Sequence, residues 1–172
     1  YDDGIYVGYR YYNTFKVPVA YEFGYGLSYT TFTYSNLSLS SNTFSNSITA
    51  TVTIKNTGNV AGREVVQFYL SAPASSLDKP NEELKDFAKT SMLKPGEAQQ
   101  ITFTISPRDL ASFNTAASSW IADAGTYTVK IGASSRDFRQ TATFSLPAEI
   151  VVEKAHKALA PSRTFNELKP QK

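Results

Sequence analysis

Short segments in which apolar and polar residues strictly alternate restrict the fold of this sequence more than any other feature. In the clearest one, Ile48–Ile54, every second residue is apolar and threonines fill the positions between. A period of two places all the apolar side chains on one face of a β-strand. Further strand segments are predicted at residues 35–40, 64–71, 84–93, 101–105, 127–131 and 142–146. Seven short strands with turns between them predict an all-β sandwich, not a parallel sheet covered by helices.

Two of these segments also indicate where they lie in a sheet. Segment 64–71 has apolar residues on both faces, with Val65 and Tyr69 in one of the two rows, so it predicts a central strand. Segment 84–93 is less regular and predicts a bulged or edge strand. A turn is predicted at Lys94–Glu97, where proline fixes φ and glycine accepts the left-handed conformation.

A tyrosine near the start of a strand indicates which type of β-sandwich the chain forms. Within Asp123–Val129, Tyr127 has the spacing of a tyrosine corner, in which the hydroxyl bonds to upstream backbone and the ring fills the core. Val129 occupies the position of the second cysteine of an antibody domain, and the chain contains no cysteine. These features fit an immunoglobulin-like sandwich of the fibronectin type III type. Tyr127 as an ordinary core aromatic would give the same fold class.

The first 29 residues have a different composition from the rest. Of the 23 aromatic residues of the chain, 12 lie within residues 1–34, and neither the helical nor the strand period is sustained there. We expect an extended aromatic arm over residues 1–29 that cannot form a core of its own and lies on another surface. Its rings anchor the arm between two domains or, as the alternative, form a platform for sugars. They are Tyr6, Tyr9, Tyr11, Tyr12, Tyr21, Phe23, Tyr25 and Tyr29.

The two remaining parts of the chain are assigned by their patterns. The sandwich is expected to occupy residues 30–146, and residues 147–172 are expected to be a tail or linker. Within this tail, Glu149–Leu159 can form a short helix that ends before Pro161.

Composition excludes several classes of function. The absence of cysteine excludes a disulfide scaffold, thiolate catalysis and cysteine-bound zinc, and the single histidine excludes a multi-histidine metal site. A net charge of +2 without a basic cluster argues against nucleic-acid binding. No apolar run approaches the ~20 residues that span a bilayer.

Acidic residues that are adjacent in sequence do not form a catalytic pair. Glycosidases need two carboxyl groups that face each other across ~5–9.5 Å. The adjacent pairs are Asp2/Asp3 and Glu82/Glu83, and neighbours on an extended segment point to opposite sides. We expect Asp2 and Asp3 to be solvated or structural in a loop between domains. We expect Glu82 and Glu83 to lie in a solvated turn or to contact another domain.

Two other groups of charged residues have structural explanations. Arg108 and Asp109 are expected to form an ion pair or a cap at the end of a strand. His156 has Glu153 three residues before it. One histidine and one glutamate are too few for a metal site, so we expect a surface histidine.

Two short motifs carry little functional information. The glycine-rich run Gly24–Ser28 lacks the strand–loop–helix context of a phosphate-binding loop. Asn36–Ser38 fits the pattern of an N-glycosylation acceptor, but such tripeptides are frequent by chance.

Three blocks of sequence together resemble glycoside hydrolase family 3, the β-glucosidase and β-xylosidase family. The first block is Gly4–Tyr12, and the second, Phe23–Phe32, is similar to the family's junction between an α/β sandwich domain and a fibronectin type III-like domain. The third follows the order and spacing of the family's fibronectin type III-like domain. It comprises Asn56–Gly58, Ala61–Gly62, Glu64–Gln67, Pro80, Glu83–Lys85, Phe87, Pro95–Glu97, Arg108–Leu110, Trp120, Gly125–Tyr127 and Gly132–Ser135.

This resemblance implies a non-catalytic accessory domain that packs against the TIM-barrel and α/β sandwich domains of the same enzyme, in one chain or as a separate chain. The family's nucleophile lies on the TIM barrel, and its acid/base residue lies in or near the α/β domain. We therefore assign no catalytic, cofactor-binding or metal-binding residue to this chain. The enzyme implied is β-glucosidase-like, retaining and cofactor-free, and acts on β-linked sugars from non-reducing ends. Val65, Tyr69 and the rings of the arm are the expected contacts.

Two alternatives remain open for the function, and one remains for the tail. The domain could bind a polysaccharide or lignin, or it could retain glycosidase activity of its own. Residues 153–161 and 166–170 resemble a connector to a further domain, as in family members with a rearranged domain order.

Overall fold

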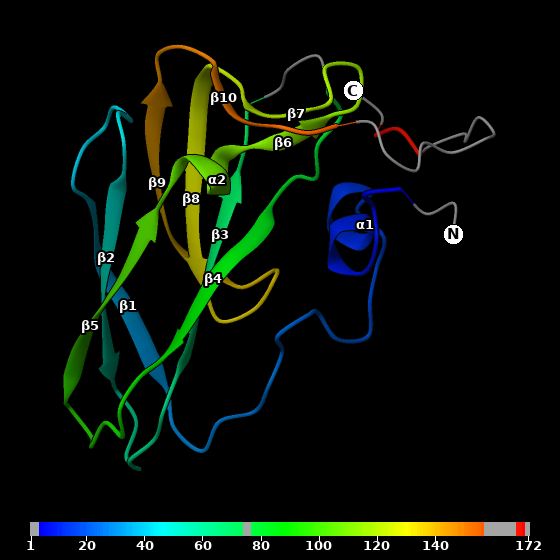
Figure 1. Ribbon diagram of the computed structural model, residues 1–172. Coiled ribbons are helices and arrows are strands. Elements are labelled where there is room, and N and C mark those ends of the chain that lie inside the picture. The colour runs from blue at the N-terminus through cyan, green and yellow to red at the C-terminus, as the bar shows by residue number, and fades with distance from the viewer. Residues whose placement is uncertain (1–3, 74–76, 157–167, 171–172) are drawn as a thin grey trace.

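The molecule is a sandwich of two antiparallel sheets with an arm on one outer face (Figure 1). The structure is a computed structural model and describes residues 4–73, 77–156 and 168–170. The first sheet has the order β1-β2-β5 and the second has the order β4-β3-β8-β9. Their strands are β1 (Phe32–Leu39), β2 (Ile48–Asn56), β5 (Ala98–Ile105), β4 (Glu83–Lys89), β3 (Val65–Ser71), β8 (Gly125–Gly132) and β9 (Phe138–Leu146).

These seven strands are the seven that the alternation predicts, and the all-β sandwich is confirmed. The inward residues of β2, from Ile48 to Ile54, are completely buried. Across the interior, the ring of Phe68 on β3 stacks on that of Phe103 on β5, with centroids 5.1 Å apart. The core therefore lies between the two sheets, as the single apolar face of each amphipathic strand requires.

The predicted places of β3 and β4 are also confirmed. β3 lies between β4 and β8, and β4 is an edge strand. The register of the β3–β4 pair shifts between Phe68 and Tyr69, so β4 has the irregularity of a bulged strand. β1 begins earlier than predicted, and a bulge between Ser35 and Ser38 contains Asn36 at a φ of 55°.

A third, smaller sheet with the order β10-β7-β6 lies at one end of the sandwich and was not predicted. Its strands are β6 (Ser112–Asn114), β7 (Ser119–Ala122) and β10 (Ile150–Lys154). The helix predicted over Glu149–Leu159 is therefore wrong for the residues that the structure describes. Ile150 and Val152 pack against the core while β10 pairs with β7, and β-branched side chains favour such a strand. Residues 157–159 lie outside the described part of the chain.

Two short helices complete the described structure. α2 (Pro107–Leu110) follows β5, and the backbone and hydroxyl of Ser106 both donate hydrogen bonds to the Asp109 carboxylate. Asp109 therefore caps the start of α2, which confirms the cap and not the ion pair as its role. α1 (Tyr9–Thr14) lies in the arm, which is not extended throughout as predicted. Among the described residues, no helix is long and apolar enough to cross a bilayer.

The tyrosine corner is confirmed by its hydrogen bond. The Tyr127 hydroxyl donates to the backbone carbonyl of Asp123, four residues upstream, at 2.9 Å. Its ring is completely buried and stacks on Phe144 with centroids 5.5 Å apart. Burial raises the pKa of Tyr127 to about 12, because the charged phenolate would lose its hydration.

Candidate docking face on the N-terminal arm

The inner side of the arm covers the outer face of the sheet β4-β3-β8-β9. The ring of Tyr9, on α1, packs edge-on against Tyr69 of β3 at 5.9 Å and stacks on Phe23 at 5.2 Å. The Tyr9 hydroxyl also accepts a hydrogen bond from the backbone N–H of Leu84 at 2.7 Å. Tyr69, predicted as a contact to another domain, is therefore completely buried beneath its own arm.

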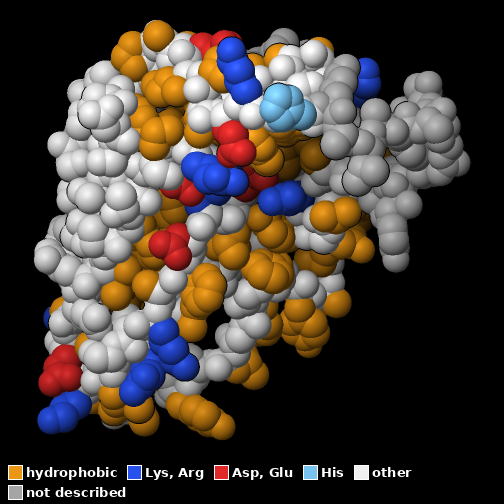
Figure 2. Space-filling view, in the orientation of Figure 1, with side chains coloured by type: hydrophobic (Ala, Val, Ile, Leu, Met, Phe, Trp, Pro, Cys, Tyr) orange, Lys and Arg blue, Asp and Glu red, His pale blue; other side chains and the backbone are white. Residues whose placement is uncertain are grey.

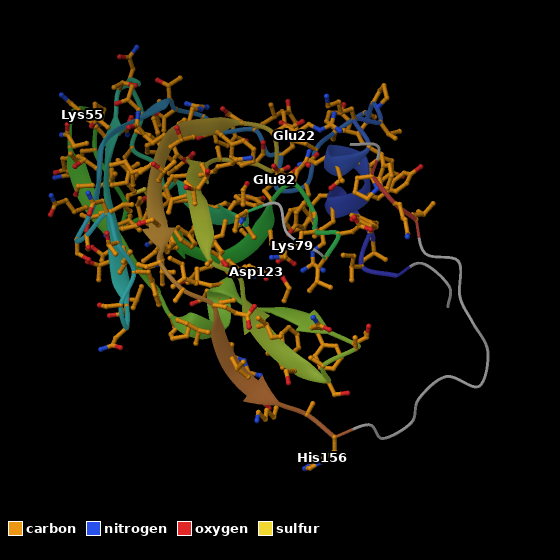
Figure 3. The ribbon with its side chains drawn as sticks, turned by 90° about the horizontal axis from the view of Figure 1, so that it is seen from above. Glu22, Lys55, Lys79, Glu82, Asp123 and His156 are labelled. Atoms are coloured by element: carbon orange, nitrogen blue, oxygen red, sulfur yellow. The ribbon has the colours of Figure 1, made fainter. Side chains whose placement is uncertain are left out.

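Polar contacts centred on Glu82 fasten α1 to the sheet. Glu82 is only 6% exposed, and its carboxylate binds Lys130 of β8 at 2.9 Å and the Asn13 amide at 2.7 Å. Its neighbour Glu83 instead pairs with Arg10 at 2.9 Å. Figure 3 places Glu82 beside α1. The solvated turn expected here is wrong for Glu82, because the arm covers it. The two carboxylates therefore bind different partners.

The loop between β8 and β9 holds the rest of the arm. The Arg136 guanidinium donates hydrogen bonds to the Asn13 side chain and to the backbone carbonyls of Tyr12 and Val17. The backbone N–H of Ser135 donates to the carbonyl of Phe23 at 2.8 Å. The roles of Asn13 and Arg136 are not predictable from the sequence, because neither residue belongs to a pattern of charge or spacing. Their roles depend on contacts between distant residues, 69 positions apart for Asn13 and Glu82 and 119 or more for the bonds of Arg136.

The outer side of the arm carries large apolar side chains that the described structure leaves largely or about half exposed. We call these residues the docking face: Tyr21, Phe23, Tyr25, Leu27 and Tyr29, which are 73%, 51%, 48%, 91% and 98% exposed. Figure 2 shows hydrophobic side chains along the path of the arm, from beneath α1 to the lower end of the sandwich. Val65, at the start of β3, is 40% exposed. Large apolar side chains gathered in this way are typical of interaction surfaces.

A groove of about 420 Å³ lies beside the docking face, between the arm, the start of β3 and the β8–β9 loop. Glu64 lies in its lining, and the Tyr34 hydroxyl donates a hydrogen bond to the Glu64 carboxylate at 2.7 Å. Arg139 lies over the Tyr34 ring and pairs with Asp137. Burial raises the pKa of Glu64 and, together with the hydrogen bond to Glu64, that of Tyr34.

The other charged candidates lie apart from this face. His156 is exposed at the end of β10 and points away from the domain (Figure 3), as expected for a surface histidine. Glu153 pairs with Arg108 at 3.4 Å, and both side chains are largely exposed. Arg108 therefore does not pair with Asp109. Asp2 and Asp3 lie outside the described residues.

The structure also places the two short motifs, Asn36–Ser38 and Gly24–Ser28. Asn36 is exposed on β1, which is an edge strand. Gly24–Ser28 is irregular backbone and no helix follows it, so the phosphate-binding loop remains rejected.

Similar proteins place this arrangement in a known family. Residues 64–135 match the family described as the fibronectin type III-like domain. The chain is also 44% identical over 146 residues to β-glucosidase BoGH3A of Bacteroides ovatus, covering 84% of this chain and 19% of that protein. This chain carries a fibronectin type III-like domain of the glycoside hydrolase family 3 type. It is the non-catalytic accessory domain that the resemblance implies.

Solved structures agree with this assignment of the fibronectin type III-like domain. β-Glucosidase 3B from Thermotoga neapolitana in complex with glucose superposes with a TM-score of 0.84 at 50% identity, covering 89% of this chain and 21% of that one. A β-glucosidase from Paenibacillus barengoltzii superposes with a TM-score of 0.89 at 36% identity, covering 100% of this chain and 20% of that one. The chain thus spans about a fifth of the length of these relatives.

Proposed function

We propose that the docking face packs against the catalytic domains of a longer β-glucosidase to which this chain belongs. That enzyme hydrolyses β-linked sugars from non-reducing ends with retention of configuration, as the family resemblance implies, and this chain supplies none of its catalytic, metal-binding or cofactor-binding residues. The observation that carries the proposal is the division of the arm into two sides. Its inner side is bound to the sandwich, whereas Leu27 and Tyr29 on its outer side are almost fully exposed.

The energetics favour burial of this outer side. Removing one fully exposed, large apolar side chain from water contributes ~1.5–3 kcal/mol. Tyr21, Leu27 and Tyr29 are exposed enough to gain most of this on burial, whereas the other two residues of the docking face are already about half covered. The arm is also held by the Arg10–Glu83 ion pair and by hydrogen bonds to Glu82 and from Arg136. Little further ordering of the arm is then needed when a partner binds, so less of the gain from burial is lost as entropy.

The test compares one double variant in two settings. Leu27→Ser combined with Tyr29→Ser should leave the thermal midpoint of the isolated chain nearly unchanged, because both side chains are exposed there. In the full-length enzyme the same change should lower both the midpoint and the glucosidase activity. Val151→Ser, at an exposed apolar residue of β10, is the matched control and should have little effect in either setting. Equal behaviour of the double variant in both settings would refute the docking proposal.

Binding of a polysaccharide or lignin is the second candidate function. Beyond the arm, Phe113 and Trp120 form an exposed pair across β6 and β7, with ring centroids 5.5 Å apart. Aromatic rings of this kind can stack on sugar rings. Retention of the chain on insoluble cellulose, xylan or lignin, lost on Trp120→Ala, would support this function. No retention on any of the three would exclude it.

Residual glycosidase activity has less support. In the part of the chain that the structure describes, the adjacent acids Glu82 and Glu83 are committed to Lys130 and Arg10. Release of nitrophenol from aryl β-glycosides by the purified chain would establish such activity, and an inactive chain at high protein concentration would exclude it.

A further inference from the structure

We propose that the groove beside the docking face receives a basic side chain, a lysine or an arginine, from the catalytic part of the enzyme, and that Glu64 is its partner. This inference rests on the docking function proposed above and specifies the chemistry of one contact. It follows from the lack of a cation paired with the Glu64 carboxylate and from the apolar side chains that line the rim of the groove.

Glu64 is half-buried but lacks a cationic partner. One carboxylate oxygen accepts the hydrogen bond from the Tyr34 hydroxyl at 2.7 Å. Within the part of the chain that the structure describes, no lysine, arginine or histidine nitrogen lies within 4 Å of this carboxylate. A carboxylate removed from water without a paired charge is unfavourable. Burial raises the pKa of Glu64 even though the Tyr34 hydrogen bond and the more distant charge of Arg139 act to lower it.

The cations nearest to the groove do not complete the site. The guanidinium of Arg139 binds the Asp137 carboxylate through two nitrogens and lies over the Tyr34 ring. Arg63, at the mouth of the groove, is exposed. Glu22, also in the lining, accepts a hydrogen bond only from the neutral Ser134 hydroxyl.

The charge of the groove therefore favours a cation from outside. Its lining contains three carboxylates and two guanidinium groups, which leaves one negative charge in excess. A carboxylate from a partner would be repelled. An apolar side chain would further dehydrate Glu64 without pairing its charge.

The rim of the groove fits a long side chain with a charged end. Tyr25, Leu27 and Val65 are all exposed by 40% or more and contribute apolar surface to its lining. The aliphatic stem of a lysine or arginine packs well on such surface while its charged group reaches polar partners. Because Leu27 belongs to the docking face, a partner that covers this face also closes the groove over Glu64.

The experiment uses Glu64→Gln in two settings at pH 7.5. In the isolated chain this change removes an unpaired charge and should leave the thermal midpoint unchanged or raise it. In the full-length enzyme it should remove an ion pair and lower the midpoint by about 3 °C or more. Glu153→Gln, an exposed carboxylate on β10, is the matched control and should give no difference between the settings.

Each outcome decides for or against the inference. A fall of the midpoint on Glu64→Gln in the full-length enzyme alone supports the basic partner. A change in the same direction in both settings overturns it, and so does failure of this variant to fold as an isolated chain, because the sandwich itself would then need the carboxylate. If the Leu27/Tyr29 double variant lowers the full-length midpoint but Glu64→Gln does not, only the basic partner is excluded. If neither does, the docking function fails as well.

Discussion

The sandwich and the arm bury their side chains in different ways. In the sandwich, the inward residues of strands such as β2 are completely buried against the opposite sheet. In α1 no residue is fully buried, and the arm is fastened by aromatic contacts, one ion pair and hydrogen bonds. The sandwich thus satisfies its own apolar surface, whereas the arm satisfies only its inner side. A segment that is firmly attached yet apolar on its outside is suited to connect this domain to another one.

The largest effect is expected in the core of the sandwich. Phe68→Ala removes a ring that is 1% exposed and stacked on Phe103, so it should lower the free energy of unfolding by ~3–5 kcal/mol. Tyr21→Ala, on the docking face, should change it by less than ~0.5 kcal/mol in the isolated chain. Urea denaturation of the isolated chain measures both. Similar losses of unfolding free energy for the two variants would contradict the difference in burial between the sandwich and the docking face.

A smaller effect is expected at the attachment of the arm. Glu82→Gln leaves Lys130 without its ion pair in a largely covered site and should cost ~2 kcal/mol, the scale of one hydrogen bond to a charged group. Hydrogen exchange of the α1 amides should accelerate more than that of the β2 amides, because the Asn13 amide of α1 then donates to a neutral carbonyl in place of a carboxylate while the core is unchanged. Unchanged protection of α1 would mean that the contacts of Tyr9, Arg10 and Arg136 hold the arm without Glu82. Glu83→Gln, at the more exposed ion pair with Arg10, provides a comparison within the same attachment.

The smallest effect is expected at the tyrosine corner. Tyr127→Phe removes one buried hydrogen bond and should cost ~1 kcal/mol in urea denaturation near neutral pH. The folded-state pKa of Tyr127 is raised from 10.0 to about 12. Its contribution to stability is therefore complete below pH 10 and is lost as the pH rises through about 12. The variant should lack this alkaline loss, and an unchanged pH profile would contradict the role of the hydroxyl.

The sequence predicted the parts of the fold that follow from a local period. Most strands of the two large sheets were predicted because their apolar residues alternate, β3 was predicted from apolar residues on both faces, and β4 from a less regular pattern. The position of Tyr127 relative to its strand predicted the corner. α1 could not be predicted. Its sequence, Tyr9–Thr14, is rich in aromatic residues, and Gly8 before it makes no side-chain cap. Contacts with Tyr69 and Glu82 hold it instead. β10 was missed because Ile150–Lys154 gains its strand partner only from β7.

The candidate site shows the same division. The concentration of aromatic residues in the first 29 positions, together with the lack of a period there, predicted that the arm must lie on another surface. Which rings face inward and which remain exposed was not predictable, because Tyr9 and Tyr21 look alike in sequence. Glu82 and Glu64 were likewise indistinguishable from solvated acids.

By itself, the sequence determined an all-β sandwich with its strands, its tyrosine corner and an aromatic arm that needs a surface. The tertiary structure alone decided that Glu82 is paired and covered, that Glu64 is half-buried without a cation, and that Leu27 and Tyr29 remain exposed. The physical reason is the range of the interactions. Hydrophobic alternation acts between residues two positions apart, whereas burial and charge pairing depend on which distant segments meet.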